Sequence, residues 1–171
     1  MSRSARDLVA EHWERIYRVN YLVSRDASEA EDLTQETLAK ALASIDQFDP
    51  SRPLEPWLNR IASNTAKDWL RRKRKLEFVA LDAEPVDDAD TIADQIAARS
   101  LPDDLSEALS RLDPLSRLVI VLRHLLDMNA TEIATLLETE PATVRTRLRR
   151  GLQQVREELQ SEEVGHADEA R

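Results

Sequence analysis

Apolar residues recur along most of this chain at intervals of three and four positions, which is the spacing of one face of an α-helix. Alternation of apolar and polar residues, the pattern of a half-buried strand, is hard to find, and the chain has only two glycines. We therefore expect an all-α protein. The pattern predicts helices over residues 5–24, 28–45, 54–74, 103–112, 115–126, 131–138 and 142–160.

The first three predicted helices form a domain over residues 1–75. Ser28 with Glu31 is typical of a capping box at the start of the second helix. The third helix has an apolar arc that includes Leu58 and Trp69. Its other side carries residues at spacings of four and three, which align in one stripe: Arg60, Asn64, Lys67, Arg71 and Arg74. Such a stripe can hold a phosphate backbone and read bases; the alternative is an ordinary solvated helix face.

The last four helices form a second domain over residues 103–160, and the final two make a helix-turn-helix. Asp113 before Pro114, and Asn129 with Glu132, are typical helix starts. On the last helix, apolar residues from Val144 to Leu159 share an arc of roughly 80°. The outer face carries Arg145, Thr146, Arg147, Arg149 and Arg150. An arginine-rich face opposite an apolar edge suits the DNA major groove; a solvated charged face is again the alternative.

The net charge of −9 is unevenly distributed. Residues 76–103 contain eight acidic residues and one arginine, whereas RRKRK (71–75) and RTRLRR (145–150) are basic. Local potential matters more than total charge for attraction to DNA. Because 76–102 also lacks sustained periodicity, we expect an acidic linker there, with a short helix near 91–99. The acidic tail, 161–171, is expected to be disordered.

The composition argues against catalysis. There is no cysteine, which excludes disulfides and thiolate metal sites. The three histidines, His12, His124 and His166, are too scattered to suggest a metal site and are expected to be surface or hydrogen-bonded side chains. The chain has no glycine-rich phosphate loop and no credible pair of nucleophile and base, so we expect no cofactor and no enzyme activity.

No apolar run in the chain resembles a signal peptide or approaches the roughly 18 residues of a membrane span. We therefore expect a soluble, cytoplasmic protein that does not insert into a membrane.

Both halves resemble the extracytoplasmic-function class of bacterial sigma factors, in the right order and with a variable linker between them. The segments that carry the resemblance are EAEDLTQETLAKALASIDQFD (29–49), PLEPWLNRIASNTAKDWLRRKRK (53–75) and LDPLSRLVIVLRHLLDMNATEIATLLETEPATVRTRLRRGLQQVREEL (112–159). The resemblance implies a transcription initiation factor that binds core RNA polymerase, directs it to specific promoter DNA and opens the strands at the minus-ten element. It also implies an anti-sigma factor as a partner.

The resemblance further implies a role for individual residues. Contacts with core polymerase fall on Asp32, Leu33, Gln35, Glu36 and Lys40. Contacts with the minus-ten element fall on Phe48, Asp49, Arg60, Asn64, Lys67, Asp68, Arg71 and Arg72. Contacts with the minus-thirty-five element fall on Thr143, Arg145, Thr146, Arg147, Arg149 and Arg150. Glu138 and Ala142 stand where the class commonly has glycine, which predicts a helix-turn-helix turn of a different shape. The turn 25–27 also lacks the glycine that the class usually has before the capping box.

Two other functions are compatible with the residues. An autonomous helix-turn-helix regulator would bind operators as a dimer, tightly and without strand opening. A pure interaction module would titrate a partner through its acidic surface, but that function leaves both basic faces unexplained. A protein that binds duplex DNA poorly by itself favours the sigma factor over the autonomous regulator.

Overall fold

α-Helices make up nearly all of the described chain. The computed structural model describes the backbone of residues 5–79 and 103–169, and the side chains of residues 11–75 and 104–161. No strand occurs within these ranges, so the expected all-α class is confirmed. The helices are α1 (Ala5–Ser24), α2 (Ala27–Ala43), α3 (Leu54–Val79), α5 (Asp103–Ser110), α6 (Pro114–His124), α7 (Ala130–Leu136) and α8 (Pro141–Glu169), with one 3-10 turn, η1 (Ile45–Gln47).

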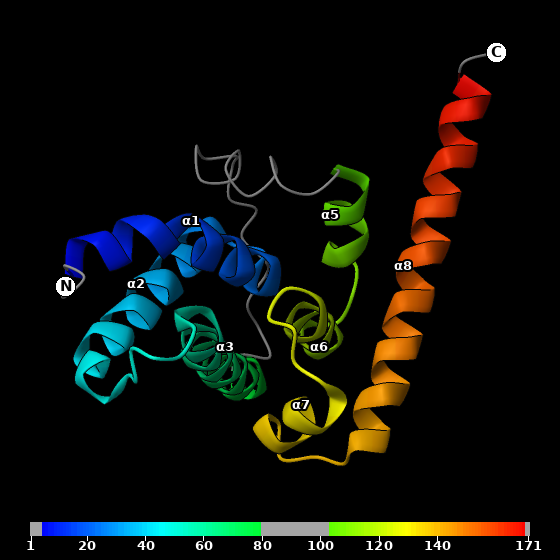
Figure 1. Cartoon of the computed structure of the whole chain (residues 1–171). Helices are drawn as coiled ribbons and strands as arrows, with labels where there is room; N and C mark the ends of the chain where they lie inside the picture. The colour runs from blue at the N-terminus through cyan, green and yellow to red at the C-terminus, as the bar shows by residue number, and fades with distance from the viewer. Residues whose placement is uncertain (1–4, 80–102, 170–171) are drawn as a thin grey trace.

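Helices of the two halves lie against each other. Figure 1 shows α1, α2 and α3 grouped on one side, α5, α6 and α7 in the middle, and α8 along the outer edge. α1 packs against α6, and α3 packs against both α6 and α7. The two halves therefore pack together in this structure.

Two predicted helix starts are confirmed and one is wrong. Asp113 accepts hydrogen bonds from the backbone amides that open α6, and Asn129 forms a capping box with Glu132 at α7. The capping box predicted for Ser28 and Glu31 is absent, because Asp26 caps α2 instead through a hydrogen bond of 2.7 Å from the amide of Glu29. The Asp26 carboxylate, directly before the helix, accepts a hydrogen bond from an amide that has no acceptor within the helix.

Two predicted helix ends also need correction. α3 continues through Val79, so the first four residues of the expected linker are helical. α8 continues through Glu169, so the tail that we expected to be disordered extends the last helix. Both helices run on because no proline or glycine interrupts these stretches except Gly165, and a single glycine costs only about 1 kcal/mol in a helix. The rest of the linker, including the short helix expected near 91–99, lies outside the described residues.

One continuous apolar cluster runs through both halves. The first half contributes residues such as Ile16, Leu58 and Trp69, and the second contributes Leu118 and Ile133. Burial of this surface supplies the main stabilising free energy of both halves, at about 25 cal/mol per Å² of apolar area. Because the cluster is shared, separating the halves exposes part of it to water.

A buried arginine joins three helices across the boundary between the halves. The Arg117 side chain on α6 is only 6% exposed. Its Nε donates a hydrogen bond of 3.1 Å to the carbonyl of Val23 at the end of α1. One of its terminal nitrogens donates to carbonyls at and just after the end of α5, including that of Ser110 at 3.1 Å. The guanidinium thus satisfies carbonyls left free where two helices end, which is also where a positive charge is favoured.

Two further hydrogen bonds cross the same boundary. Arg25 donates to the hydroxyl of Ser106 at 2.8 Å, and the Asn59 amide donates to the carbonyl of Leu126 at 3.4 Å. Arg25 has a φ of 58°, in the left-handed region. The turn before α2 therefore has the left-handed geometry that glycine favours, although an arginine occupies it.

We expect Ile133→Ala to lower the free energy of unfolding by about 2–5 kcal/mol, because this fully buried side chain would leave a cavity in the shared cluster. Ile45→Ala is the matched control, since Ile45 is 37% exposed and should cost less than about 1 kcal/mol. Urea unfolding followed by circular dichroism measures both values. Equal losses for the two variants would contradict the assignment of Ile133 to the core.

Candidate nucleic-acid interface

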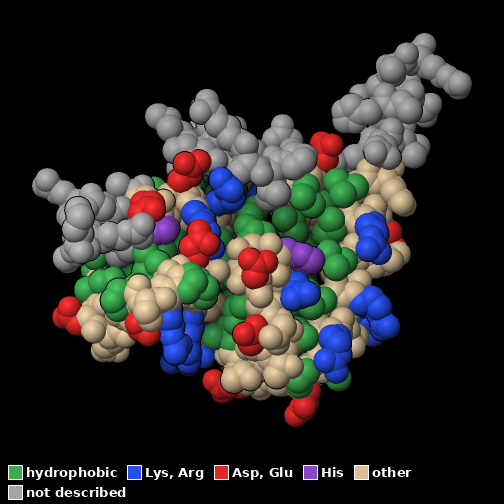
Figure 2. Space-filling view, in the orientation of Figure 1, with side chains coloured by type: hydrophobic (Ala, Val, Ile, Leu, Met, Phe, Trp, Pro, Cys, Tyr) green, Lys and Arg blue, Asp and Glu red, His purple; other side chains and the backbone are tan. Residues whose placement is uncertain are grey.

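α8 divides into a buried edge and an outer basic face, as the sequence predicted. Val144 and Val155 are buried, and Leu148, Leu152 and Leu159 pack partly buried against the shared cluster. The outer face exposes Thr143, Arg145, Arg149 and Arg150, while Thr146 and Arg147 are half-buried. Figure 2 shows Lys and Arg side chains following one another along this helix. The helix can therefore present arginines to a DNA groove while its apolar edge stays packed.

Arg147 differs from the other arginines because neighbouring side chains hold it. It donates hydrogen bonds to the Ser116 hydroxyl at 3.0 Å and to a carboxylate oxygen of Asp113 at 3.3 Å. Burial alone would raise the pKa of Asp113, but hydrogen bonds from Ser116 and Leu115 and the charge of Arg147 outweigh it and lower that pKa from 3.8. Asp113 thus caps α6 and orients Arg147 at once.

The turn before α8 has an unusual backbone. Glu138 has a φ of 55°, a conformation that is uncommon for residues other than glycine. The turn therefore has the left-handed geometry that glycine favours, and the expectation of a different turn shape stays a prediction. The glutamate side chain gives this turn a carboxylate, which lies 3.9 Å from Nζ of Lys67 on α3.

The predicted stripe on α3 faces the second half of the chain. Arg60, Asn64 and Lys67 line one pocket of about 690 Å³, whose opposite wall comes from α7 and the residues before it. Lys67, Arg71 and Arg74 line a second pocket of about 500 Å³. All five stripe residues therefore border pockets that the two halves share.

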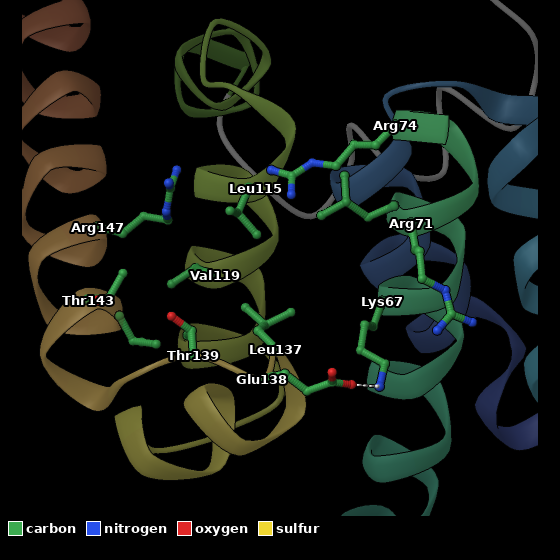
Figure 3. Close-up of a pocket in the computed structure, with 12 residues that line it drawn as sticks. Lys67, Arg71, Arg74, Leu115, Val119, Leu137, Glu138, Thr139, Thr143 and Arg147 are labelled. Carbon is green, nitrogen blue, oxygen red and sulfur yellow. Dashed lines mark ion pairs between the residues drawn. The ribbon is translucent and has the colours of Figure 1, made fainter. Parts of the chain in front are cut away.

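Figure 3 shows this second pocket, with side chains of α3 on one side and Thr143 and Arg147 of α8 on the other. Leu115 and Val119 of α6 lie between them. The pocket has basic side chains on both walls and apolar residues at its base. It brings together residues predicted for two different DNA elements.

The other predicted minus-ten residues have local partners. The Phe48 ring packs on Trp57 with 5.2 Å between centroids. Asp49 accepts hydrogen bonds from the amide and hydroxyl of Ser51, which lower its pKa. Asp68 pairs with Arg71 at 3.3 Å. Asp49 therefore forms contacts within the loop, and Asp68 forms a contact within α3.

Arg72 lies off the stripe and points toward α2. It forms an ion pair of 3.3 Å with Glu36, which also binds Lys40 at 2.7 Å. Burial would raise the pKa of Glu36, but these two cations lower it. Arg72 therefore ties α3 to α2 and is poorly placed to contact DNA together with the stripe.

The predicted polymerase-binding residues of α2 do not all reach the surface. Asp32 and Gln35 are exposed, and Asp32 has no hydrogen bond or ion pair with any described residue. Leu33 is 3% exposed and belongs to the shared cluster, so its predicted contact with polymerase is wrong for this conformation. Leu33 follows the apolar spacing of α2, which already marked it as a core residue. The accessible part of this surface consists of the exposed Asp32, Gln35 and Lys40 and the half-buried Glu36.

Sequence analysis missed two contributors to the site. Glu138 appeared only as a departure from a glycine, and nothing in the local pattern indicated that its carboxylate meets Lys67. Arg117 lies in the apolar run LSRLVIVL, and a lone charge in such a run is a usable sign of a buried, hydrogen-bonded cation. Burial, together with the charge of Arg25, lowers the pKa of Arg117 to about 10, so it stays protonated at neutral pH.

The described residues add little to suggest other sites. No helix among them is long and apolar enough to cross a membrane, and no group of three or more His, Cys, Asp or Glu side chains in those ranges is placed to hold a metal ion. His124 is exposed as expected. His12, however, is 7% exposed and its Nε2 has no hydrogen-bond partner among the described residues, contrary to our expectation.

The two halves match two regions of one protein family. The family model for sigma-70 region 2 matches residues 8–76, and that for sigma-70 region 4 matches residues 103–155. The RNA polymerase sigma-E factor of Streptomyces coelicolor is 36% identical over 78% of this chain and 73% of its own length. This chain belongs to the sigma-70 family.

Other relatives place the chain in the extracytoplasmic-function (ECF) group. The ECF sigma factor SigE of Mycolicibacterium smegmatis is 37% identical over 90% of this chain, which spans 60% of that longer protein. SigW of Bacillus subtilis is 29% identical over 90% of this chain and 87% of its own length. The chain is thus a promoter-directing sigma factor of RNA polymerase and not an autonomous regulator.

Two solved structures share the fold. The sigma factor RpoE of Bartonella quintana, in complex with the anti-sigma factor NepR, has a TM-score of 0.62 and 23% identity, and covers 89% of this chain and 94% of its own. CnrH, in complex with the cytosolic domain of CnrY, has a TM-score of 0.52 and 26% identity, covering 92% of this chain and 88% of its own. The likeness at 23% identity supports the arrangement of helices alone.

We expect Asp113→Ala to lower the free energy of unfolding by about 1 kcal/mol at pH 7, because α6 loses its N-cap. The folded pKa of Asp113 lies below 3.8, so its contribution is present above that pH and is lost as the pH falls through the folded value. The difference between Asp113→Ala and the parent should therefore shrink below about pH 4. Urea unfolding across pH 3–7 measures it, with Asp113→Asn, which keeps the cap, as control. A difference that is constant with pH would contradict the role of the carboxylate charge.

Proposed function

We propose that three separate surfaces of this sigma factor perform its three tasks. The exposed part of α2, from Asp32 to Lys40, binds core RNA polymerase. The stripe of α3, together with Phe48 and Asp49 in the preceding loop, binds the minus-ten element. The outer face of α8 binds the minus-thirty-five element. The proposal rests on two basic surfaces of one chain, the α3 stripe and the α8 face. Each surface lies on a helix whose opposite edge packs in the shared cluster.

The α2 surface suits a basic partner. Glu36 is already paired with Lys40 and Arg72, which neutralise much of its charge. Asp32 is exposed and unpaired among the described residues, so it offers its charge to a partner without breaking an internal contact. We therefore assign the larger share of polymerase binding to Asp32.

The α3 stripe suits phosphates and bases together. Arg60 and Arg71 are exposed cations, and Asn64 between them carries an amide that can donate and accept. Its amide now donates to the carbonyl of Arg60 in its own helix, at 2.8 Å, and can exchange this bond for one to a base. Stabilising an unstacked base at this surface would favour strand opening at the minus-ten element.

The α8 face suits direct reading of bases. Arg149 and Arg150 are exposed on the outer side of a helix whose other edge is packed, and arginine binds guanine through two parallel hydrogen bonds. Thr143, Arg145 and Thr146 add contacts to bases or phosphates nearer the start of the helix. Arg147, held by Asp113 and Ser116, serves best as a fixed phosphate contact.

The chain itself contributes recognition, and the polymerase performs RNA synthesis, so no cofactor is needed. Because the sigma factor RpoE is held together with the anti-sigma factor NepR, and CnrH with the cytosolic domain of CnrY, we propose an anti-sigma partner here as well. A cytoplasmic location follows from these partners.

Asp32→Ala is expected to reduce run-off transcription by weakening the binding of core polymerase, with a loss of about 1–3 kcal/mol if the carboxylate is a central contact. The assay combines bacterial core polymerase, the protein and fragments of its source genome. Glu31→Ala removes the same charge one residue away and is the matched control. If both variants transcribe like the parent, Asp32 is not a polymerase contact.

Arg149→Ala with Arg150→Ala is expected to abolish specific transcripts while leaving polymerase binding intact, since each bidentate contact to a base is worth about 1–3 kcal/mol. Arg156→Ala is the control, because Arg156 is an exposed arginine further along α8. Co-purification with core polymerase measures the first step, and run-off transcription measures the second. Normal transcripts from the double variant would exclude this face as the minus-thirty-five surface.

A further inference from the structure

One arginine on the outer face of α8 is held in place by the neighbouring helix. Nη1 of Arg147 donates hydrogen bonds to the hydroxyl of Ser116 at 3.0 Å and to Oδ1 of Asp113 at 3.3 Å. No described residue forms a hydrogen bond or an ion pair with the other three arginines of this face, Arg145, Arg149 and Arg150. The outer face of α8 therefore carries one fixed cation beside three free ones.

We propose that Ser116 and Asp113 are positioning residues for DNA binding, which direct the guanidinium of Arg147 toward a phosphate of the minus-thirty-five element. This assignment rests on the α8 surface proposed above, and it extends that surface to the start of α6. The DNA backbone follows the same path past every base sequence, so a side chain with a preset direction suits a phosphate contact. Arg147 then fixes the position of α8 on the duplex, and the free arginines read the bases.

The guanidinium of Arg147 keeps donors for a ligand. The bonds to Ser116 and Asp113 come from Nη1 alone, and Nε and Nη2 donate to no described residue. Because the guanidinium is planar and rigid, holding one nitrogen restricts the direction of the other two. Phosphate oxygens accept two parallel N–H bonds from arginine, which matches the edge that Nε and Nη2 leave free.

The two acceptors on α6 support each other. Ser116 is only 8% exposed, so water competes little for its hydroxyl. Burial alone would raise the pKa of Asp113, but hydrogen bonds from the hydroxyl and the amide of Ser116, with the charge of Arg147, lower that pKa from 3.8. The carboxylate is therefore charged at neutral pH and holds the guanidinium together with the hydroxyl.

A glycine lets α8 lie close to α6 beside these contacts. A Cβ at Gly151 would lie 2.9 Å from Cδ1 of Ile120 and 3.8 Å from Cβ of Ser116. Glycine is unfavourable inside a helix compared with alanine, so its presence at this position fits a need for close approach. Gly151 follows Arg147 by four residues, or about one helical turn, and Ile120 follows Ser116 by the same interval. The close approach thus lies one turn from the bond that holds Arg147.

The starts of α6 and α8 border one groove of about 520 Å³. Arg147 and Arg150 give the groove two cations, and Thr143 and Thr146 give it two hydroxyls. Asp113 is the one carboxylate among the residues that line it. The charged side chains of the groove therefore leave a net positive charge, which favours a phosphate as the ligand.

Removal of the Ser116 hydroxyl tests the positioning role without removing a charge. We expect Ser116→Ala to weaken promoter binding by the complex of core polymerase and sigma factor about threefold, within the range for ordering a long side chain on binding. Arg147→Ala should weaken it about tenfold, as expected for a charged hydrogen bond. The double variant should bind like Arg147→Ala alone, because Ser116 acts through Arg147. A gel-shift titration with a promoter fragment that the parent transcribes measures each affinity.

The dependence on salt and on base sequence identifies the ligand of Arg147. Arg147→Ala should reduce the slope of log affinity against log salt concentration by about one, because one phosphate contact is lost. Its affinity loss should be the same on promoters with single base-pair changes in the minus-thirty-five element. Ser116→Ala should leave the salt slope unchanged, since the cation is still present.

Two variants serve as controls. Ser110→Ala removes a hydroxyl that donates to the carbonyl of Glu107 within α5, and it should bind promoter DNA like the parent. Ser116→Thr keeps the hydroxyl and should restore most of the affinity lost in Ser116→Ala. Urea unfolding and co-purification with core polymerase establish that each variant is folded and assembled.

Three outcomes overturn the positioning role. An equal loss from Ser116→Ala in the parent and in Arg147→Ala would mean that the serine acts on the fold and not through the arginine. Unchanged promoter binding by Arg147→Ala would exclude the contact itself. A loss limited to one base pair would make Arg147 a base contact and not a phosphate contact. Normal binding by Arg149→Ala with Arg150→Ala contradicts the proposed α8 surface instead, so the two failures are distinguishable.

Discussion

The arrangement of this protein depends on one buried guanidinium. Arg117 lies among apolar side chains, where an isolated charge would be strongly unfavourable. It is tolerated because it meets carbonyls that two helix ends leave without partners, those of α1 and α5. The guanidinium of Arg117 gives up hydrogen bonds to water and gains carbonyl acceptors, and the carbonyls gain a donor. The result is a single polar junction that fixes the relative position of the two halves.

Around that junction, the apolar cluster makes the two halves one body in the free protein. A protein that must span two distant promoter elements would be expected to keep its halves independent. The structure instead buries apolar surface at their boundary and places the α3 stripe beside the second half, while Arg145, Arg149 and Arg150 of α8 stay exposed. Separation of the halves would therefore expose apolar surface to water and break the Arg117 junction.

The side chains at the site are of two kinds. Arg147, Arg72 and Asp68 each have an internal partner, whereas Arg149, Arg150 and Asp32 are exposed. The paired residues hold the helices and loops in position, and the exposed residues are available to another molecule. A residue's place in a motif does not distinguish these roles, because both kinds lie on the same helix faces and follow the same spacing.

The sequence by itself determined the helices, their apolar edges and the two basic faces, because each follows from the local period of 3.6 residues and from side-chain chemistry. It also indicated the family, since the motifs of both halves occur in order. Only the tertiary structure decided that the halves share a core, that Arg117 meets Val23, and that Glu138 meets Lys67. The Arg117–Val23 and Lys67–Glu138 contacts join residues about 94 and 71 positions apart, and local periodicity carries no information about such pairs. The sequence indicates which face of a helix a residue occupies. The packing of the helices determines which residue it contacts across the boundary.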